Sequence, residues 1–203
     1  NNAEQKCKQT ATTLEKIIKH LSNIEVEKSV SCLPGRNLFM SKKSLYKIGG
    51  FPEHLVTCED YFFTDKASKI GALFYSSSAS YTHLGEDKQF VAMFSKEVWR
   101  GQSNLQSLEG RKIPLREWPS IIVPPFILIC SLLSLLSLVL GFTGMLVTSL
   151  FMALMPVCAY TMRLWRIAKA DVSILNILLF YITYFPARAL GTFLGLFKTI
   201  TVR

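Results

Sequence analysis

The hydrophobic residues divide the chain into two parts that suit different solvents. Residues 1–118 mix polar and apolar positions as a water-soluble domain does, whereas almost every residue from Ile121 onward is apolar. No charged residue occurs between 121 and 162. A membrane-spanning helix needs about 20 apolar residues, so this run is long enough for two spans. The pattern therefore predicts a soluble part followed by a membrane part.

The apolar part predicts two to three transmembrane helices. The spans are expected near 121–140, 143–162 and 173–196. The turn between the first two is expected at Gly141-Phe142-Thr143-Gly144, and Pro186 and Arg188 interrupt the third. A charge at membrane depth costs about 3 kcal/mol, so we expect Arg188 to face protein or an interface rather than lipid. Whether residues 186–203 cross the membrane or lie along it stays open.

The spacing of polar and apolar positions in the soluble part predicts short helices and strands. Thr12 or Thr13 is the expected cap of a first helix. Ser41 opens a second helix, which Gly49 and Gly50 close because glycine tolerates a left-handed backbone. The expected elements are a helix over 11–28, a short strand and then a helix over 35–51, a helix over 59–70, one or two strands over 72–82, and an amphipathic helix over 87–104.

Charge and composition place the soluble part in the cytoplasm. The net charge is +9, and Arg163, Arg166 and Lys169 form a basic loop after the second span, which favours the cytoplasmic side. Two crossings return the chain to its starting side. The basic residues form no stripe with interleaved aromatics, so nucleic acid is not an expected partner. We expect the chain to divide into a soluble part (1–110), an interfacial linker with Trp118 as anchor (111–120) and a transmembrane region (121–203).

The cysteines do not predict a disulfide framework or a zinc site. Their number is odd, and no Cys-x-x-Cys occurs. Reduced thiols facing the cytoplasm fit this pattern best. The five are Cys7, Cys32, Cys58, Cys130 and Cys158.

A set of short motifs in the soluble part carries the functional information. GRNLFMSKKSLYKIGGFPE (35–53) is followed by Glu59-Asp60 in EDYFF, and then by Gly71 and Trp99-Arg100-Gly101. The set resembles the C-terminal half of the catalytic domain of membrane-anchored family-2 glycosyltransferases. The resemblance covers roughly residues 30–105. It implies an α/β fold, a partial GT-A-like (Rossmann-like) domain, followed by two to three transmembrane helices.

The resemblance assigns the catalytic role to Asp60. In that family the Asp of a Glu-Asp motif removes the proton from the acceptor hydroxyl, which makes a poor nucleophile reactive. Attack from the face opposite the nucleotide then inverts the anomeric carbon. Glu59 is expected to position the site or to bind acceptor. Without the surrounding motifs, both acids would be interpreted as helix N-terminal residues stabilised by the helix dipole.

Further residues are assigned to substrate and metal by the same resemblance. The loop of Gly49, Gly50 and Phe51 is expected beside the donor and acceptor sugars, although a simple helix stop explains the glycines equally well. Trp99 and Arg100 are expected to bind substrate, with the guanidinium suited to diphosphate; the alternative is an interfacial Trp-Arg pair. Their order departs from the Gln-x-x-Arg-Trp motif of processive family members, which argues against a cellulose-synthase-like polymerase.

A divalent metal, Mg²⁺ or Mn²⁺, is expected from the resemblance, with His83 as a candidate ligand and a structural histidine as the alternative. The Asp-x-Asp metal motif of the donor-nucleotide half does not occur in these residues. The chain is therefore expected to be a fragment or one half of a split enzyme, with the missing N-terminal half as a partner and catalysis incomplete without it.

The resulting hypothesis is an inverting glycosyltransferase that is integral to a bacterial or archaeal plasma membrane, with its catalytic part cytoplasmic. It would transfer a sugar from a nucleotide-sugar donor to a lipid-linked or glycan acceptor in cell-envelope polysaccharide synthesis. The alternative is a non-catalytic membrane docking module derived from a glycosyltransferase. A small transporter or channel subunit would leave the Glu-Asp and Gly-Gly motifs unexplained.

Overall fold

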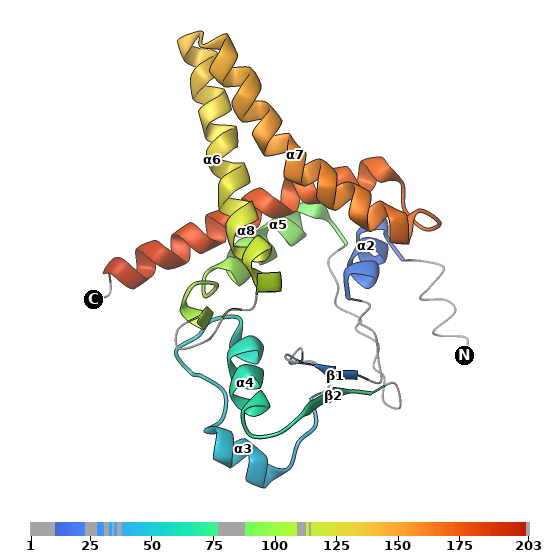
Figure 1. The fold of residues 1–203 in the computed structure, drawn as a ribbon, viewed down its shortest axis with the longest axis vertical. Helices are drawn as coiled ribbons and strands as arrows, with labels where there is room; N and C mark the ends of the chain where they lie inside the picture. Colours follow the sequence, from blue (N-terminus) through green and yellow to red (C-terminus); the bar gives the residue numbers. More distant parts are fainter. Residues whose placement is uncertain are drawn as a thin grey trace.

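The computed structural model describes residues 11–22, 28–30, 33, 35, 38–76, 88–108, 113 and 115–201. In chain order the elements are α2 (Thr13–Ser22), β1 (Lys28–Val30), α3 (Lys42–Ile48), α4 (Glu59–Ser68), β2 (Leu73–Tyr75), α5 (Phe90–Gly101), the 3-10 helices η1 (Gln106–Leu108) and η2 (Leu115–Glu117), α6 (Trp118–Leu140), α7 (Thr143–Ala168) and α8 (Ile174–Thr201). Figure 1 shows three levels: a hairpin of α6 and α7, a middle level of α8, α5 and α2, and a lower unit of α3, α4 and the strands.

The fold is mostly helical, which corrects the predicted α/β class. Helix accounts for 74% of the described residues, and the strands found there form one two-stranded sheet. That sheet is antiparallel and pairs Lys28 with Tyr75, Ser29 with Phe74 and Val30 with Leu73. A Rossmann-like domain needs several parallel strands joined by crossover helices. Three-residue strands in an antiparallel pair do not provide this, so the expected GT-A-like domain is not observed.

The lower unit has a small hydrophobic core of its own. Ile48 of α3, Phe63 and Ala67 of α4 and Leu73 of β2 are buried together, with Leu45 packed against them. Ser41 caps α3 by accepting a hydrogen bond from the backbone N–H of Ser44 (3.1 Å). The core thus fixes α4, which carries the Glu-Asp motif, against α3 and the sheet.

Helices α6 and α7 form a long apolar hairpin. Gly141 has a φ of 73° and ends α6, and its backbone N–H contacts the carbonyls of Ser137 and Leu138. At 23 residues α6 is about 35 Å long, enough to cross the hydrocarbon core of a bilayer. Both α6 and α7, and also α8, are long and apolar enough to span a membrane. The chain is therefore a membrane protein, as predicted.

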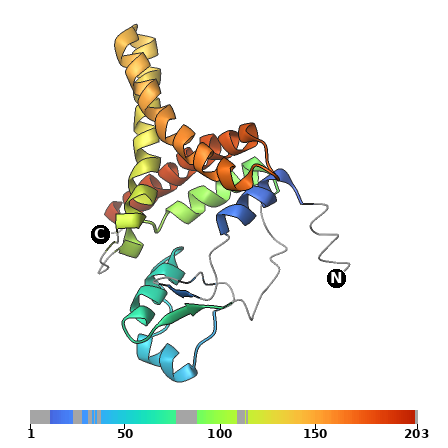
Figure 2. The ribbon, with the colours of Figure 1, turned by 45° about the vertical axis from the view of Figure 1, so that its right-hand side comes forward.

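The middle level holds the largest core of the molecule. It joins α2, α5 and α8 to the lower parts of α6 and α7, as Figure 2 shows from a second side. At its centre, Leu14 and Ile17 of α2, Met93 of α5, and Ile177 and Phe180 of α8 are almost fully buried. A hydrogen bond from His20 to Asp171 (2.8 Å) further ties α2 to the loop before α8.

Several predicted elements are confirmed and others are wrong. Thr12 caps the first helix, and Gly49 ends α3 with a left-handed φ of 91°. The turn between the two long helices lies at Gly141, as predicted. The strand expected before Ser41 is wrong, because residues 38–40 are irregular and the strand lies at Lys28–Val30 instead. Of the strands expected over 72–82, β2 is observed, and residues 77–82 lie outside the described part of the chain.

Candidate functional site

Asp60 lies in the first turn of α4, where its carboxylate is fixed by two backbone groups. One oxygen, Oδ2, accepts a hydrogen bond from the N–H of Gly35 at 3.0 Å, and Oδ1 accepts one from the N–H of Tyr61 at 2.8 Å. The N-terminal end of a helix favours a negative charge. The side chain is half-buried, so the carboxylate is oriented but remains accessible to a substrate.

Gly35 permits this arrangement because it has no side chain. A Cβ atom at residue 35 would lie 3.3 Å from the Cβ of Asp60 and 3.9 Å from its Oδ2. That approach is tighter than most contacts between carbon atoms, so a larger residue would move the loop away from α4. Two members of the motif set, Gly35 and Asp60, are therefore in contact although they lie 25 positions apart in the sequence.

The loop that enters α4 is anchored to the end of α5. The hydroxyl of Thr57 donates to the carbonyl oxygen of Arg100 at 2.9 Å, and Ser103 Oγ accepts from the N–H groups of Val56 (3.0 Å) and Thr57 (3.2 Å). Cys58 follows in a left-handed conformation with a φ of 63°, which is uncommon outside glycine. These contacts set the start of α4, and hence Asp60, relative to the middle level of the molecule.

The thiol of Cys58 is enclosed between this loop and α5. Its sulfur lies 3.9 Å from the carbonyl oxygen of Arg100 and 3.9 Å from Oδ1 of Asn104. Burial raises the pKa of the thiol, and the negative charge of Asp60 raises it further, while the positive charge of Arg188 lowers it. Cys58 is therefore a neutral packing residue and not an activated nucleophile.

Glu59 and the Gly-Gly-Phe loop take different positions. The Glu59 side chain is exposed beside Asp60. Gly49 and Gly50 both have a positive φ (91° and 74°) and close α3, and a Cβ added to either would meet no atom within 4 Å. Phe51 stacks on Phe63 of α4, with ring centroids 4.2 Å apart. The observed role of this loop is to end α3 and to pack on α4; its role in sugar binding stays a prediction.

Trp99 and Arg100 lie at the end of α5, where Arg100 is part of an ion cluster. Trp99 is 48% exposed. Arg100 Nη1 donates to Oε1 of Glu97 at 2.6 Å, and Arg188 Nε of α8 lies 3.6 Å from Oε2 of the same glutamate. The Glu97 side chain is only 5% exposed. Arg188 thus faces protein, as predicted, and Arg100 is held by a carboxylate.

Sequence reasoning missed Glu97 and the glycines of α8 that contact the backbone of α5 and of Gln102. In the sequence, Glu97 is one acid in an ordinary amphipathic helix. Only the contact with Arg188 of α8 reveals that Glu97 is buried between two arginines, the other being Arg100 of its own helix. Gly191 and Gly195 form a Gly-x-x-x-Gly pattern within an apolar stretch. That spacing is a known signal of close helix packing and could have been recognised.

The described residues do not test the expected metal. No group of three or more His, Cys, Asp or Glu side chains comes together among them, and His83 lies outside the described part of the chain. A shallow hollow at the hairpin turn, lined by Gly141 to Met145, lies on other elements than Asp60 and offers no charged group.

Comparisons with known proteins leave the chain without an assigned family. No protein-family model matches the sequence, and no curated protein or solved structure is significantly similar to it. The likeness to family-2 glycosyltransferases therefore rests on the motifs alone, and the activity that it implies stays a prediction.

Proposed function

We propose that this protein takes part in the transfer of a sugar from a nucleotide-sugar donor to a lipid-linked or glycan acceptor at the cytoplasmic face of a membrane. Asp60 acts as the general base. The proposal rests on the local motif set and its geometry and does not depend on an α/β domain.

The observation that carries the proposal is the fixed, accessible carboxylate of Asp60. Each carboxylate oxygen can accept two hydrogen bonds, and the bonds from Gly35 and Tyr61 use one on each oxygen. Each oxygen therefore retains capacity for a substrate hydroxyl. A base is effective only when it is held within hydrogen-bonding distance of the proton that it removes.

The chemistry assigned to this carboxylate is a single displacement. Asp60 accepts the proton of the acceptor hydroxyl while the hydroxyl oxygen forms a bond to the anomeric carbon. The bond from that carbon to the nucleoside diphosphate breaks, and the diphosphate leaves with the electron pair. The anomeric configuration inverts because attack and departure occur on opposite faces.

The contacts between the α4 loop and α5 support a membrane-bound acceptor. The hydrogen bonds of Val56 and Thr57 place the start of α4 against the end of α5, and α5 packs along α8 at the base of the membrane hairpin. A lipid-linked acceptor that stays in the membrane is the substrate class that this location favours.

The test uses this chain together with the donor-nucleotide half that the resemblance predicts as its partner, purified from membranes into lipid nanodiscs. Release of nucleoside diphosphate is measured across a panel of nucleotide sugars, with membrane-lipid extracts as acceptors. Asp60→Asn is expected to lower the rate about 10²–10⁴-fold, the usual contribution of a general base. The matched control is Asp65→Asn on the same helix, whose carboxylate pairs with Lys69 (2.8 Å) and should leave the rate unchanged.

The outcomes separate the two hypotheses. Full activity in folded Asp60→Asn would exclude Asp60 as the base. The lack of activity with any donor would favour the non-catalytic docking module instead, since the contact between Gly35 and Asp60 would then only hold a loop in place.

A further inference from the structure

Helix α8 does not follow the direction of the other two apolar helices. Helices α6 and α7 lie side by side as a hairpin, whereas α8 runs across the base of that hairpin (Figures 1 and 2). By length and composition α8 could cross a membrane. In this arrangement, however, α6 and α8 cannot both run along the bilayer normal. The contacts between α8 and α5 indicate which of the two helices crosses the bilayer.

Three glycines allow α8 and α5 to pack in direct backbone contact. A Cβ on Gly191 would collide with the carbonyl oxygen of Val98, and one on Gly195 would collide with that of Gln102. On the other helix, a Cβ on Gly101 would lie 2.8 Å from the carbonyl oxygen of Arg188. The two backbones are in direct contact along this seam. Wherever α8 lies in a membrane, α5 therefore lies beside it.

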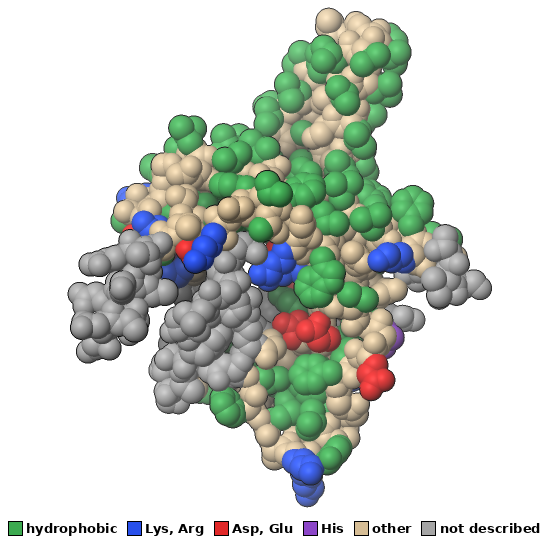
Figure 3. Space-filling view, turned by 180° about the vertical axis from the view of Figure 1, so that it is seen from behind, with side chains coloured by type: hydrophobic (Ala, Val, Ile, Leu, Met, Phe, Trp, Pro, Cys, Tyr) green, Lys and Arg blue, Asp and Glu red, His purple; other side chains and the backbone are tan. Residues whose placement is uncertain are grey.

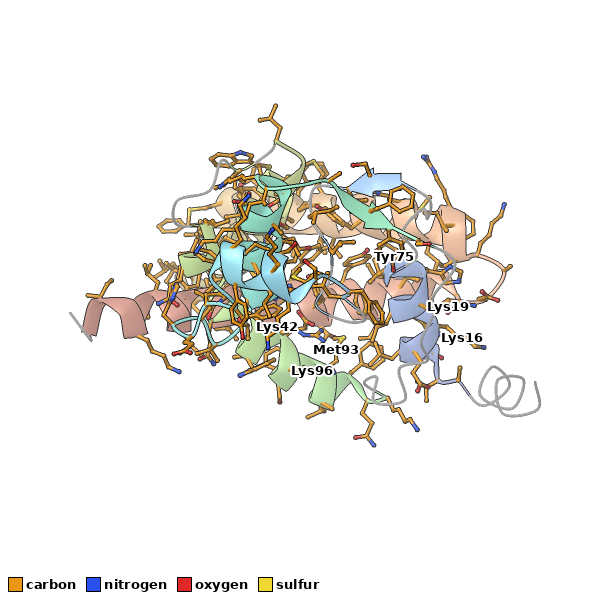
Figure 4. The ribbon with its side chains drawn as sticks, turned by 90° about the horizontal axis from the view of Figure 1, so that it is seen from below. Lys16, Lys19, Lys42, Tyr75, Met93 and Lys96 are labelled. Atoms are coloured by element: carbon orange, nitrogen blue, oxygen red, sulfur yellow. The ribbon has the colours of Figure 1, made fainter. Side chains whose placement is uncertain are left out.

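Helix α5 is unsuited to the interior of a bilayer. It has 12 residues, so it is about 18 Å long, well short of the hydrocarbon thickness. It carries Lys96, Glu97 and Arg100, and each charge at the bilayer centre costs about 3 kcal/mol. Seen from below, α5 with Lys96 runs alongside α8, and α2 with Lys16 and Lys19 lies to the right of α5 (Figure 4). The side of the molecule that carries the charged residues of α5 and α2 is therefore suited to contact with water or lipid headgroups.

The two charged residues of α8 point towards α5. Arg188 lies near the middle of α8 and pairs with Glu97 at 3.6 Å, and Lys198 Nζ donates to Oε1 of Gln102 at 2.7 Å. If α8 crossed the bilayer, Arg188 and Glu97 would both lie close to its centre. If α8 instead lies along the membrane surface, the charges of Arg188 and Lys198 both remain where lipid headgroups meet water.

The opposite side of α8 carries an exposed stripe of large apolar side chains, the α8 stripe. Its members are separated by three or four residues, or by seven or eight, which are one-turn and two-turn spacings, and so share one face of the helix. They are Leu175, Leu179, Ile182, Leu190, Phe197 and Ile200, which are 72%, 48%, 48%, 40%, 65% and 63% exposed. Figure 3 shows hydrophobic side chains continuing from the hairpin onto the level at its base, with charged side chains along the lower edge and below.

We infer that α8 lies in the plane of the membrane surface, with the α8 stripe in the lipid and the face towards α5 at the polar boundary. The chain then crosses the membrane twice, through α6 and α7, and the end of α8 stays on the side of the soluble part. The partner of the stripe is the bilayer at the depth where headgroups meet acyl chains, as for other amphipathic in-plane helices. This inference does not depend on the proposed transferase activity.

The first experiment measures the depth of the stripe in nanodiscs of phosphatidylethanolamine and phosphatidylglycerol. Single cysteines at Leu175, Ile182, Leu190 and Phe197 are spin-labelled in the full chain with its native cysteines replaced by alanine. Accessibility to oxygen and to a water-soluble relaxation agent gives the depth of each label. These sites extend over about 33 Å of helix. An in-plane helix gives one shallow depth for all four.

Labels at Ile122, Ile129 and Leu136 on exposed positions of α6 are the matched control and should show depth that changes along the helix. A depth maximum at Ile182 and Leu190 with shallow ends would show that α8 spans the membrane and would overturn the inference. Low access to both agents would mean that protein, such as a second copy, covers the stripe, which would also overturn it.

The second experiment tests on which side α8 ends. Single cysteines at Phe142 in the hairpin turn, Lys169 at the base and Arg203 are treated with a membrane-impermeant maleimide in sealed vesicles of known orientation. The inference predicts that Arg203→Cys reacts from the same side as Lys169→Cys and from the side opposite to Phe142→Cys. Reaction of Arg203→Cys from the side of Phe142→Cys would overturn it.

Discussion

The seam between α5 and α8 yields a prediction whose magnitude follows from the structure. Gly191→Ala adds one methyl group where the Cβ would also meet the carbonyl carbon of Val98 and the Cα of Gly101, each at 2.9 Å. These are backbone atoms and cannot rotate away as a side chain can. The methyl group is accommodated only if α5 and α8 move apart.

The expected cost combines two opposing effects. Inserting a methyl group into a tightly packed site costs about 1–3 kcal/mol. Replacing glycine by alanine inside a helix returns about 0.5–1 kcal/mol, because alanine loses less backbone entropy on folding. We expect a net loss of about 1–2 kcal/mol in the free energy of unfolding, and a drop in Tm of about 2–8 °C for a chain of this size.

Thermal unfolding in detergent, followed by circular dichroism, measures this change. Gly144→Ala in α7 is the matched control, because no atom lies within 4 Å of a Cβ at that residue, and it should not lower the Tm. A Gly191→Ala protein as stable as the Gly144→Ala protein would refute the backbone contact between α5 and α8. It would also remove the main support for placing α8 with α5 at the membrane surface.

The remaining predictions concern the ion cluster and the first helix. Glu97→Ala should lower the free energy of unfolding by about 2 kcal/mol. This is less than the roughly 3–5 kcal/mol lost when a fully buried ion pair is broken, because the side chains of Arg100 and Arg188 remain 32% and 21% exposed. Denaturant unfolding measures the change, with Lys96→Ala on the same helix as the control. Thr12→Ala should cost about 0.5–2 kcal/mol by removing half of a reciprocal cap. The backbone N–H of Thr12 lowers the pKa of Glu15 from its ordinary value of 4.5, so the stability that Glu15 contributes is complete above that pH and is lost as the pH falls through the lowered pKa. A pH series of unfolding should therefore show a loss below pH 4.5 that is absent in Glu15→Gln; an unchanged acid limb would contradict it.

Local signals in the sequence predicted the elements that depend on neighbouring residues. Ser41 and Gly49 mark the ends of α3, and Gly141 marks the hairpin turn, because caps and turns are decided by hydrogen bonds within a few residues. The α/β fold class, which the resemblance to family-2 glycosyltransferases implied, was wrong, and a sheet depends on pairing between distant segments that local signals do not reveal. Strand-forming residues after Gly71 indicated a sheet, but within the described part of that stretch only Leu73–Tyr75 pairs, and with a segment more than 40 residues earlier in the chain.

The candidate site was predictable to a similar extent. The motif set singled out Asp60, and the structure adds a contact that no spacing rule provides, the hydrogen bond from Gly35. Glu97 could not be recognised, because its burial depends on Arg188 of a helix about 90 residues later. The sequence also left the direction of α8 relative to the membrane undecided. An apolar stretch of this length suits either a spanning helix or an in-plane helix whose polar face is covered by protein.

The site and the membrane placement are connected through α5. The loop before Asp60 is bonded to the end of α5 at the carbonyl of Arg100 and at Ser103, and α5 is locked onto α8 at Gly191 and Gly195. If α8 lies in the membrane surface, this series of contacts keeps Asp60 on the side of the membrane where α5 lies. If Asp60 is the base of the proposed sugar transfer, a soluble acceptor gains nothing from that position, whereas an acceptor whose lipid anchor keeps it at the surface meets Asp60 without leaving the membrane. The in-plane placement of α8 therefore favours a lipid-linked acceptor over a soluble glycan.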